Sequence, residues 1–182
     1  MDDVIATERL LLPPLSADAI QSLIDGDKER LEALTGAWFP RPLAPPPLMA
    51  DALPFFRDRL RDDPAIAPWW VRLIVRRDSG KAIGSAGFTG RPDVDGAVTL
   101  GYAVYPPFQN HGYATEAVRA LTAWALRQPG VATIRATVPP SNAPSLRVVA
   151  KAGFHRAGET IVDDEGEVEV WEVKPATGTG TA

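Results

Sequence analysis

Residues 97–138 contain a strand, a helix and a second strand in succession, and this order restricts the fold more than any other feature of the chain. Residues 97–105 alternate apolar side chains with small uncharged ones, which predicts a strand covered on both faces near the middle of a sheet. Residues 115–128 carry apolar side chains at helical spacing, and Pro129 and Gly130 end this helix before a strand at residues 131–138. Two strands connected through a helix pair in parallel, so the sequence predicts an α/β domain with a parallel central pair.

The other predicted strands favour antiparallel pairing. Residues 69–76 and 82–88 flank the turn Asp78-Ser79-Gly80, which is typical of a hairpin, and a short connection leads on to residues 97–105. A short first strand is predicted at residues 9–12. A final hairpin is predicted from Phe154 to residue 174, with its turn at residues 163–166. We therefore expect an α+β fold with a mixed, mostly antiparallel sheet flanked by helices.

Helices are predicted both before the strand at residues 69–76 and after the strand at residues 131–138. Ser16 is placed to cap the first helix, and further helices are predicted at residues 27–34 and 48–61. Five prolines among residues 40–47 indicate a stiff loop before the third of these helices. Asn142 is placed to cap a helix that follows the second parallel strand.

The composition indicates one globular domain. The chain has 182 residues, of which 45% are hydrophobic and 23% charged, enough to bury a core; we expect residues 1–174 to form one domain and residues 175–182 to be a mobile tail. The net charge of −4 gives no field that favours nucleic acid, and it mildly favours a cationic partner such as an amine or basic peptide. The oligomeric state stays open, with a homodimer as one alternative.

The residue types that are absent narrow the chemistry. Without cysteine, the chain cannot form a cysteinyl acyl-enzyme, so a thioester would have to react directly with its acceptor. His111 and His155 lie far apart and predict no metal site. No signal peptide or long apolar run is present, which predicts a cytoplasmic protein that does not enter a membrane.

A short turn connects the first parallel strand to its helix: Gln109-Asn110-His111-Gly112-Tyr113-Ala114. Backbone N–H groups at a helix start lack intrahelical partners and lie at the positive end of the helix dipole, so they can bind a diphosphate. The alternative is an ordinary turn in which Gly112 only permits tight backbone geometry.

Both parallel strands end in two prolines, Pro106-Pro107 and Pro139-Pro140. Proline donates no ladder hydrogen bond, so the strands could diverge there, and an extended ligand could pair with the backbone of residues 101–104. The alternative is that each pair simply ends its strand.

The turn resembles the acyl-CoA signature of the Gcn5-related N-acetyltransferase (GNAT) superfamily. Asn142-Ala143-Pro144-Ser145 and Lys151-Ala152-Gly153-Phe154 follow in order, and the set resembles the ribosomal-protein alanine acetyltransferase branch. The resemblance spans residues 73–173, with further support from Thr7-Glu8-Arg9-Leu10. It implies a GNAT-like fold with a splayed central pair and acetyl-CoA as co-substrate.

The resemblance also implies a set of site residues. Asn142 would contact the coenzyme near its reacting end, and the Ser145 hydroxyl would donate a proton to the leaving thiolate, a role for which Tyr102 is a rival. His111 stands where a basic residue is common, so we expect phosphate binding to depend on backbone donors. The complete set of expected cofactor-binding residues is Tyr102, Ala103, Val104, Gln109, Asn110, His111, Gly112, Tyr113, Ala114, Asn142 and Ser145.

The family's usual general base is missing, because Thr99 stands where an acidic residue is common. Glu116 and Glu159 are weaker candidates for this role. Neutralising a lysine amine of pKa about 10.4 at pH 7 costs about 4.6 kcal/mol, whereas an α-amine near 7.8 costs about 1 kcal/mol. The prediction is therefore acetyl transfer to a primary amine, either a protein N-terminus or a small molecule. The alternatives are a non-catalytic acyl-CoA-binding module and a different nucleotide-binding α/β fold.

Overall fold

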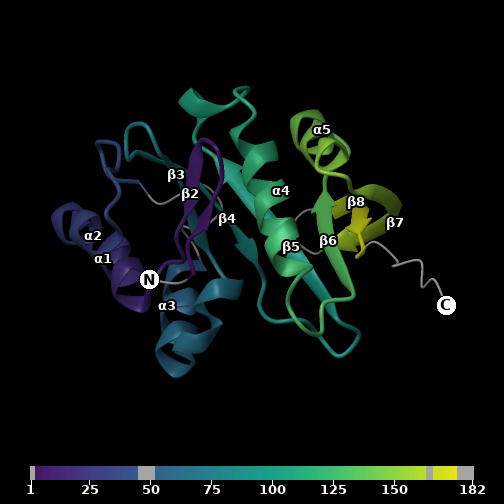
Figure 1. The fold of residues 1–182 in the computed structure, drawn as a ribbon, viewed down its shortest axis with the longest axis horizontal. Coiled ribbons are helices and arrows are strands. Elements are labelled where there is room, and N and C mark those ends of the chain that lie inside the picture. Colours follow the sequence, from purple (N-terminus) through teal and green to yellow (C-terminus); the bar gives the residue numbers. More distant parts are fainter. Residues whose placement is uncertain (1–2, 45–51, 163–165, 176–182) are drawn as a thin grey trace.

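Eight strands form one sheet with helices on both faces (Figure 1). The computed structural model describes residues 3–44, 52–162 and 166–175. The strand order is β1-β2-β3-β4-β5-β6-β8-β7, and each neighbouring pair is antiparallel except β5 and β6. This confirms the predicted mixed sheet. The strands are β1 (Ile5–Ala6), β2 (Leu10–Leu12), β3 (Arg72–Arg76), β4 (Ala82–Phe88), β5 (Ala97–Val104), β6 (Thr133–Val138), β7 (His155–Val162) and β8 (Gly166–Val173).

Local residues mark where two of the helices begin. The Ser16 side chain accepts a hydrogen bond from the Ala19 N–H at 3.2 Å, as the sequence predicted, and Pro54 lies in a first helical turn. The helices are α1 (Ala17–Asp25), α2 (Lys28–Thr35), α3 (Leu53–Asp62), α4 (Tyr113–Ala125) and α5 (Ala143–Lys151), with 3-10 segments η2 (Pro64–Trp69) and η3 (Pro106–Phe108). No helix among the described residues is long and apolar enough to cross a membrane.

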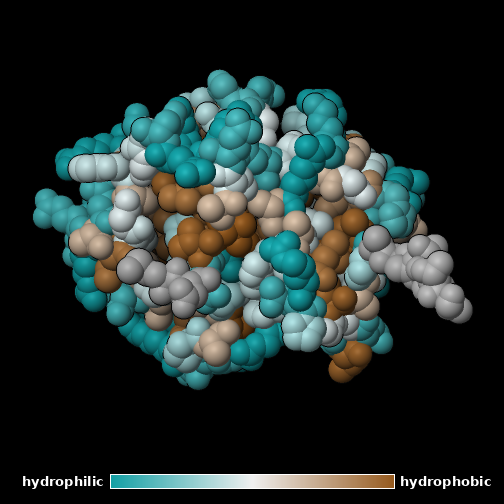
Figure 2. Space-filling view, viewed as in Figure 1, coloured by the Kyte–Doolittle hydropathy of each residue, from teal (hydrophilic) through white to brown (hydrophobic). Residues whose placement is uncertain are grey.

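The sheet has a core on each face. Strand β3 shows the two-residue period directly, because Ile74 packs into the cluster with α4 and α5 while Leu73 and Val75 pack into the cluster with α1, α2 and α3. Figure 1 shows α4 and α5 together on one face of the sheet. Figure 2 shows that, on this side of the molecule, apolar residues gather over β1 and β2 and beside α4, within a largely hydrophilic surface.

The parallel strands separate early. They pair at only three positions, of which the last is Thr99 with Arg135. Beyond this point β5 stays paired with β4 through Val104, and β6 stays paired with β8 through Val138. The predicted splaying is confirmed, but its expected cause is wrong: the strands part well before Pro106, so the prolines only end strands that have already diverged.

Other boundaries differ from the sequence prediction. The strand expected from Trp69 begins at Arg72, because Pro64 and Pro68 lie in the 3-10 segment η2. Strand β1 was not predicted. Parts of the proline loop and of the helix expected from residue 48, the turn of the final hairpin and most of the expected mobile tail lie outside the described residues.

Candidate active site

A cleft of about 570 Å³ opens where β5 and β6 diverge. Residues at the end of β5, in the turn before α4 and on the helix α5 line it. Most of the expected site residues line it, and the full lining is Tyr102, Ala103, Val104, Pro106, Phe108, Gln109, Asn110, Gly112, Tyr113, Ala114, Thr115, Asn142, Pro144, Ser145, Arg147, Val148 and Lys151. Residues from two distant parts of the chain therefore share one cleft.

The turn at residues 109–114 uses two left-handed backbone positions. Asn110 has φ of 62° and Gly112 has φ of 79°, and Gly112 is the N-cap of α4. Glycine adopts this conformation without strain, and asparagine tolerates it better than most residues. Because no side chain caps α4 at Gly112, the first N–H groups of this 13-residue helix remain available to a ligand.

Two basic side chains also line the cleft, and the sequence analysis did not identify them. Arg147 and Lys151 lie four residues apart on α5, and neither forms an ion pair with another described residue. Four-residue spacing places side chains on one helical face, which was the available sequence signal. The cleft therefore contains positive charge on α5, whereas the sequence analysis expected phosphate binding to depend on backbone donors.

Tyr102 and Ser145 meet inside the cleft. The two hydroxyl oxygens lie 2.7 Å apart, and the Tyr102 hydroxyl is also 3.1 Å from the Ser145 carbonyl oxygen. Burial raises the pKa of the Tyr102 phenol, and its hydrogen bond with Ser145 lowers it in part. The phenol therefore stays protonated at neutral pH. The two residues weighed as rival proton donors form one hydrogen-bonded pair.

Asn142 and Gln109 line the cleft, and each accepts or donates one hydrogen bond with the backbone. The Asn142 Oδ1 accepts from the Ser145 N–H at 3.2 Å, which is the capping role expected from the sequence. Among the described residues no hydrogen bond occupies its Nδ2, so this amide can still donate to a ligand. Gln109 Nε2 donates to the Val104 carbonyl oxygen at 2.9 Å and fastens the turn to the end of β5.

His111 is the one residue of the turn at 109–114 that does not line the cleft. Its ring is outside the cleft lining, stacks on the Tyr113 ring at 5.8 Å, and places Nδ1 2.6 Å from the Gln109 carbonyl oxygen. Its own carbonyl oxygen accepts from Arg9 Nη1 at 3.1 Å. His111 therefore contacts Arg9 through its backbone carbonyl, and its side chain does not line the cleft.

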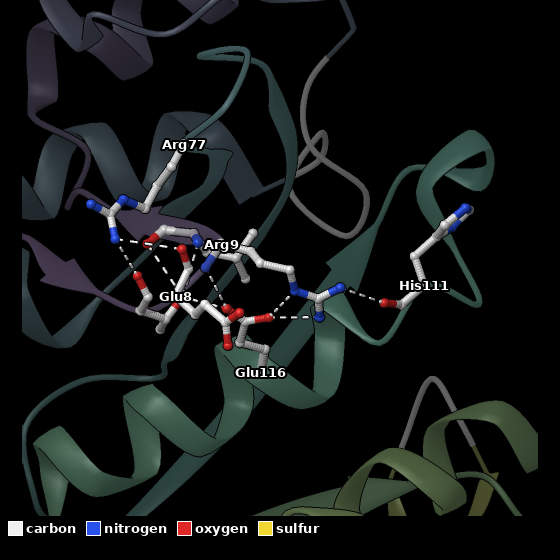
Figure 3. A network of polar contacts seen from close by, with 7 residues as sticks. Glu8, Arg9, Arg77, His111 and Glu116 are labelled. Carbon is white, nitrogen blue, oxygen red and sulfur yellow. Dashed lines mark hydrogen bonds and ion pairs between the residues drawn. The ribbon is translucent and has the colours of Figure 1, made fainter.

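Glu116 belongs to a polar network beside the turn (Figure 3). Its carboxylate accepts from the Thr7 hydroxyl at 2.6 Å, the Arg9 N–H at 2.9 Å and Arg9 Nε at 2.6 Å. Burial favours a higher pKa, but these hydrogen bonds together hold the pKa of Glu116 below its ordinary value. A carboxylate held this way is a weaker proton acceptor, and Glu116 is not among the residues that line the cleft.

The structure supplies no replacement for the missing base among the other residues that were weighed. Thr99 is half-buried at the last paired position of β5, and Glu159 pairs with Arg156 on β7. Several large aromatic residues before β4 lie outside the cleft lining: Phe39 and Trp70 are buried, and Trp69 packs against Phe88 and Trp124. Among the described residues, no cluster of three or more His, Asp or Glu side chains could hold a metal ion.

The fold is α+β, with a splayed parallel pair beside an uncapped helix start, and comparison with known proteins identifies it as an acyltransferase fold. Residues 9–155 match the sequence model described as the acetyltransferase (GNAT) domain. The uncharacterised N-acetyltransferase YjdG of Bacillus subtilis (strain 168) is 27% identical over 163 residues, covering 86% of this chain and 94% of that protein.

Solved structures agree with this assignment. The putative GNAT-family acetyltransferase from Bordetella pertussis has a TM-score of 0.63 and 26% sequence identity. The match covers 93% of this chain and 98% of the Bordetella pertussis chain. RimL, a ribosomal L7/L12 alpha-N-protein acetyltransferase in complex with coenzyme A, has a TM-score of 0.65 and 14% identity, covering 94% and 97%. The chain belongs to the GNAT family of acetyltransferases.

Proposed function

We propose that this protein transfers an acetyl group from acetyl-CoA directly to a primary amine, with an α-amine as the preferred acceptor. The observation that carries the proposal is the parting of β5 and β6 after Thr99. It opens a cleft that holds both the uncapped start of α4 and the hydroxyl pair of Tyr102 and Ser145.

The coenzyme would lie along this cleft. The diphosphate would accept hydrogen bonds from the backbone N–H groups at residues 112–114, and Arg147 and Lys151 would add positive charge from α5. The pantetheine arm would extend along residues 101–104, where β5 has lost its partner on the β6 side. The cleft volume of about 570 Å³ lies within the usual range for small-molecule sites.

The reaction needs no covalent enzyme intermediate. The amine nitrogen would attack the thioester carbonyl carbon, a C–N bond would form, and the C–S bond would break. The leaving thiolate would receive a proton from the pair of Tyr102 and Ser145, whose neutral state is favoured by the raised pKa of the phenol. The ammonium proton would pass to water, and the pair would regain its proton from solvent. Water is sufficient as the proton acceptor when an appreciable fraction of the acceptor amine is already neutral.

This last step favours a weakly basic acceptor. An α-amine with a pKa near 7.8 is neutral in an appreciable fraction at pH 7, whereas a lysine amine near 10.4 is not. RimL, whose fold this chain shares, is named as an alpha-N-protein acetyltransferase, which supports testing protein N-termini first. Small-molecule primary amines are the second group to test.

An acceptor screen tests the proposal. Acetyl-CoA would be incubated with the protein and a panel of N-terminal peptides, lysine side-chain models and small primary amines, with free thiol and product mass measured together. We expect thiol release that requires an added α-amine, with acetyl on that amine. Tight coenzyme binding without turnover on any acceptor would favour a non-catalytic acyl-CoA-binding module.

A further inference from the structure

We propose that Arg9 is a positioning residue for the diphosphate turn: it holds the His111 carbonyl on the outer side of the turn so that the Gly112 N–H faces the cleft. The inference rests on the proposed coenzyme site and adds a residue from the N-terminal hairpin to it. Arg9 precedes β2 and is more than a hundred residues from the turn in the sequence.

One guanidinium bridges both sides of the helix start (Figure 3). Arg9 Nη1 donates to the His111 carbonyl oxygen at 3.1 Å, while Nε and Nη2 each lie 2.6 Å from Glu116 Oε2. Glu116 is fixed in turn by the Arg9 N–H and by the Thr7 hydroxyl. The residue before the N-cap and the first acidic residue of α4 are therefore held by the same side chain.

The geometry of a peptide unit gives this contact its consequence. In a trans peptide the C=O and the following N–H point in opposite directions, and the His111–Gly112 peptide is trans. Gly112 lines the cleft, whereas Arg9 does not. Holding the His111 carbonyl toward Arg9 therefore directs the Gly112 N–H toward the side where the diphosphate would lie.

Glycine makes such an anchor necessary. Because glycine populates both signs of φ with similar ease, the peptide before Gly112 can reverse at little cost. A reversed peptide would present a carbonyl oxygen, with its partial negative charge, to the phosphate oxygens. The hydrogen bond from Arg9 favours the orientation that offers a donor.

Arg9 acts through the turn and not by attracting phosphate itself. Its charge is paired with Glu116, and its guanidinium lies 4.7 Å from the centre of the Tyr113 ring. Arg147 and Lys151, in contrast, line the cleft directly. Losing Arg9 should therefore weaken binding only of ligands that carry the diphosphate.

The test compares two ligands and three variants. Arg9→Ala and Arg9→Lys are compared with Arg77→Ala, which removes an arginine whose Nη1 donates to the Thr7 carbonyl oxygen at 2.8 Å on the same hairpin. Dissociation constants for coenzyme A and for pantetheine, which lacks the diphosphate, are measured by NMR titration because this method reaches weak affinities. Thermal unfolding confirms that each variant is folded.

We expect Arg9→Ala to bind coenzyme A about tenfold or more weakly and to bind pantetheine like the unmodified protein. Arg9→Lys should lose most of the same affinity, because an ammonium cannot bridge Glu116 and His111 with one planar group, and it replaces Arg9→Ala if the latter does not fold. Arg77→Ala should bind both ligands normally.

Three results would overturn the inference: an equal loss for both ligands, unchanged coenzyme affinity in both Arg9 variants, or the same loss in Arg77→Ala. A different result would reject the proposed site itself. If the unmodified protein bound pantetheine as tightly as coenzyme A, the diphosphate would contribute nothing, whatever the Arg9 variants showed.

Discussion

Replacing Gly112 with alanine, glutamine and glutamate should separate backbone strain from charge at the start of α4. Gly112 has φ of 79°, a conformation that costs other residues about 1–2 kcal/mol. An added Cβ would meet only Arg9 Nη2 at 3.5 Å, which is ordinary van der Waals contact, so little steric conflict is added. All three variants should unfold about 1–2 kcal/mol more easily, a fall in Tm of about 2–8 °C.

The affinity for coenzyme A should differ between the glutamate variant and the two uncharged variants. Alanine and glutamine add no charge, whereas a glutamate carboxylate about 5 Å from one phosphate charge would cost about 3 kcal/mol at an effective dielectric constant near 20. This corresponds to roughly a hundredfold weaker binding of coenzyme A by Gly112→Glu than by Gly112→Gln.

Calorimetric titration at low and high salt gives the decisive comparison, with urea unfolding measured on the same samples. The gap between glutamine and glutamate should narrow at high salt, because exposed charges are screened over a few ångströms at about 1 M. If both variants bound coenzyme A equally well at low salt, the diphosphate would not lie at the start of α4, and the coenzyme placement would be wrong.

Three further predictions concern the cleft and its margin. Tyr102→Phe and Ser145→Ala should each lower kcat by up to about a hundredfold with little change in KM for acetyl-CoA. The double variant should lose less than the product of the two effects, because the hydroxyls share one hydrogen bond; independent losses would contradict a common role. Arg147→Ala and Lys151→Ala should weaken coenzyme A binding and reduce its salt dependence, and an unchanged salt dependence would place both outside the phosphate site. Burial raises the pKa of Tyr105 to about 12, so the stability gained by keeping it neutral should be complete below pH 10 and lost between about pH 10 and 12. Urea unfolding of Tyr105→Phe should lack this component.

The central strand–helix–strand unit was predictable because its signals are local. The alternation in β5, the helical spacing in α4 and the stop at Pro129 each depend on neighbouring residues, and the parallel pair follows from their order. Strand β3 was placed too early for the same reason. Trp69 and Trp70 read as strand residues, but the prolines around them form a 3-10 segment.

The side-chain contacts of the site were beyond the reach of such patterns. Tyr102 and Ser145 are 43 residues apart and meet only because β5 and α5 flank the same cleft. Glu116 and Arg9 are 107 residues apart, and no periodicity indicates that one neutralises the other. The residues of the turn could be identified by motif, whereas their partners required the packed structure.

The direction of the Glu116 side chain connects these contacts to the proposed chemistry. An acidic residue in a first helical turn ordinarily stabilises the positive end of the helix dipole, by about 0.3–1 kcal/mol. Here Glu116 turns to Thr7 and Arg9, and the helix start lacks a side-chain cap. The positive end of α4 is thereby left for an external anion, and the Glu116 carboxylate, which would repel that anion, is paired with Arg9. Arg9 thus removes a competing negative charge as well as orienting the Gly112 N–H, which explains why a residue outside the cleft should control affinity for the diphosphate.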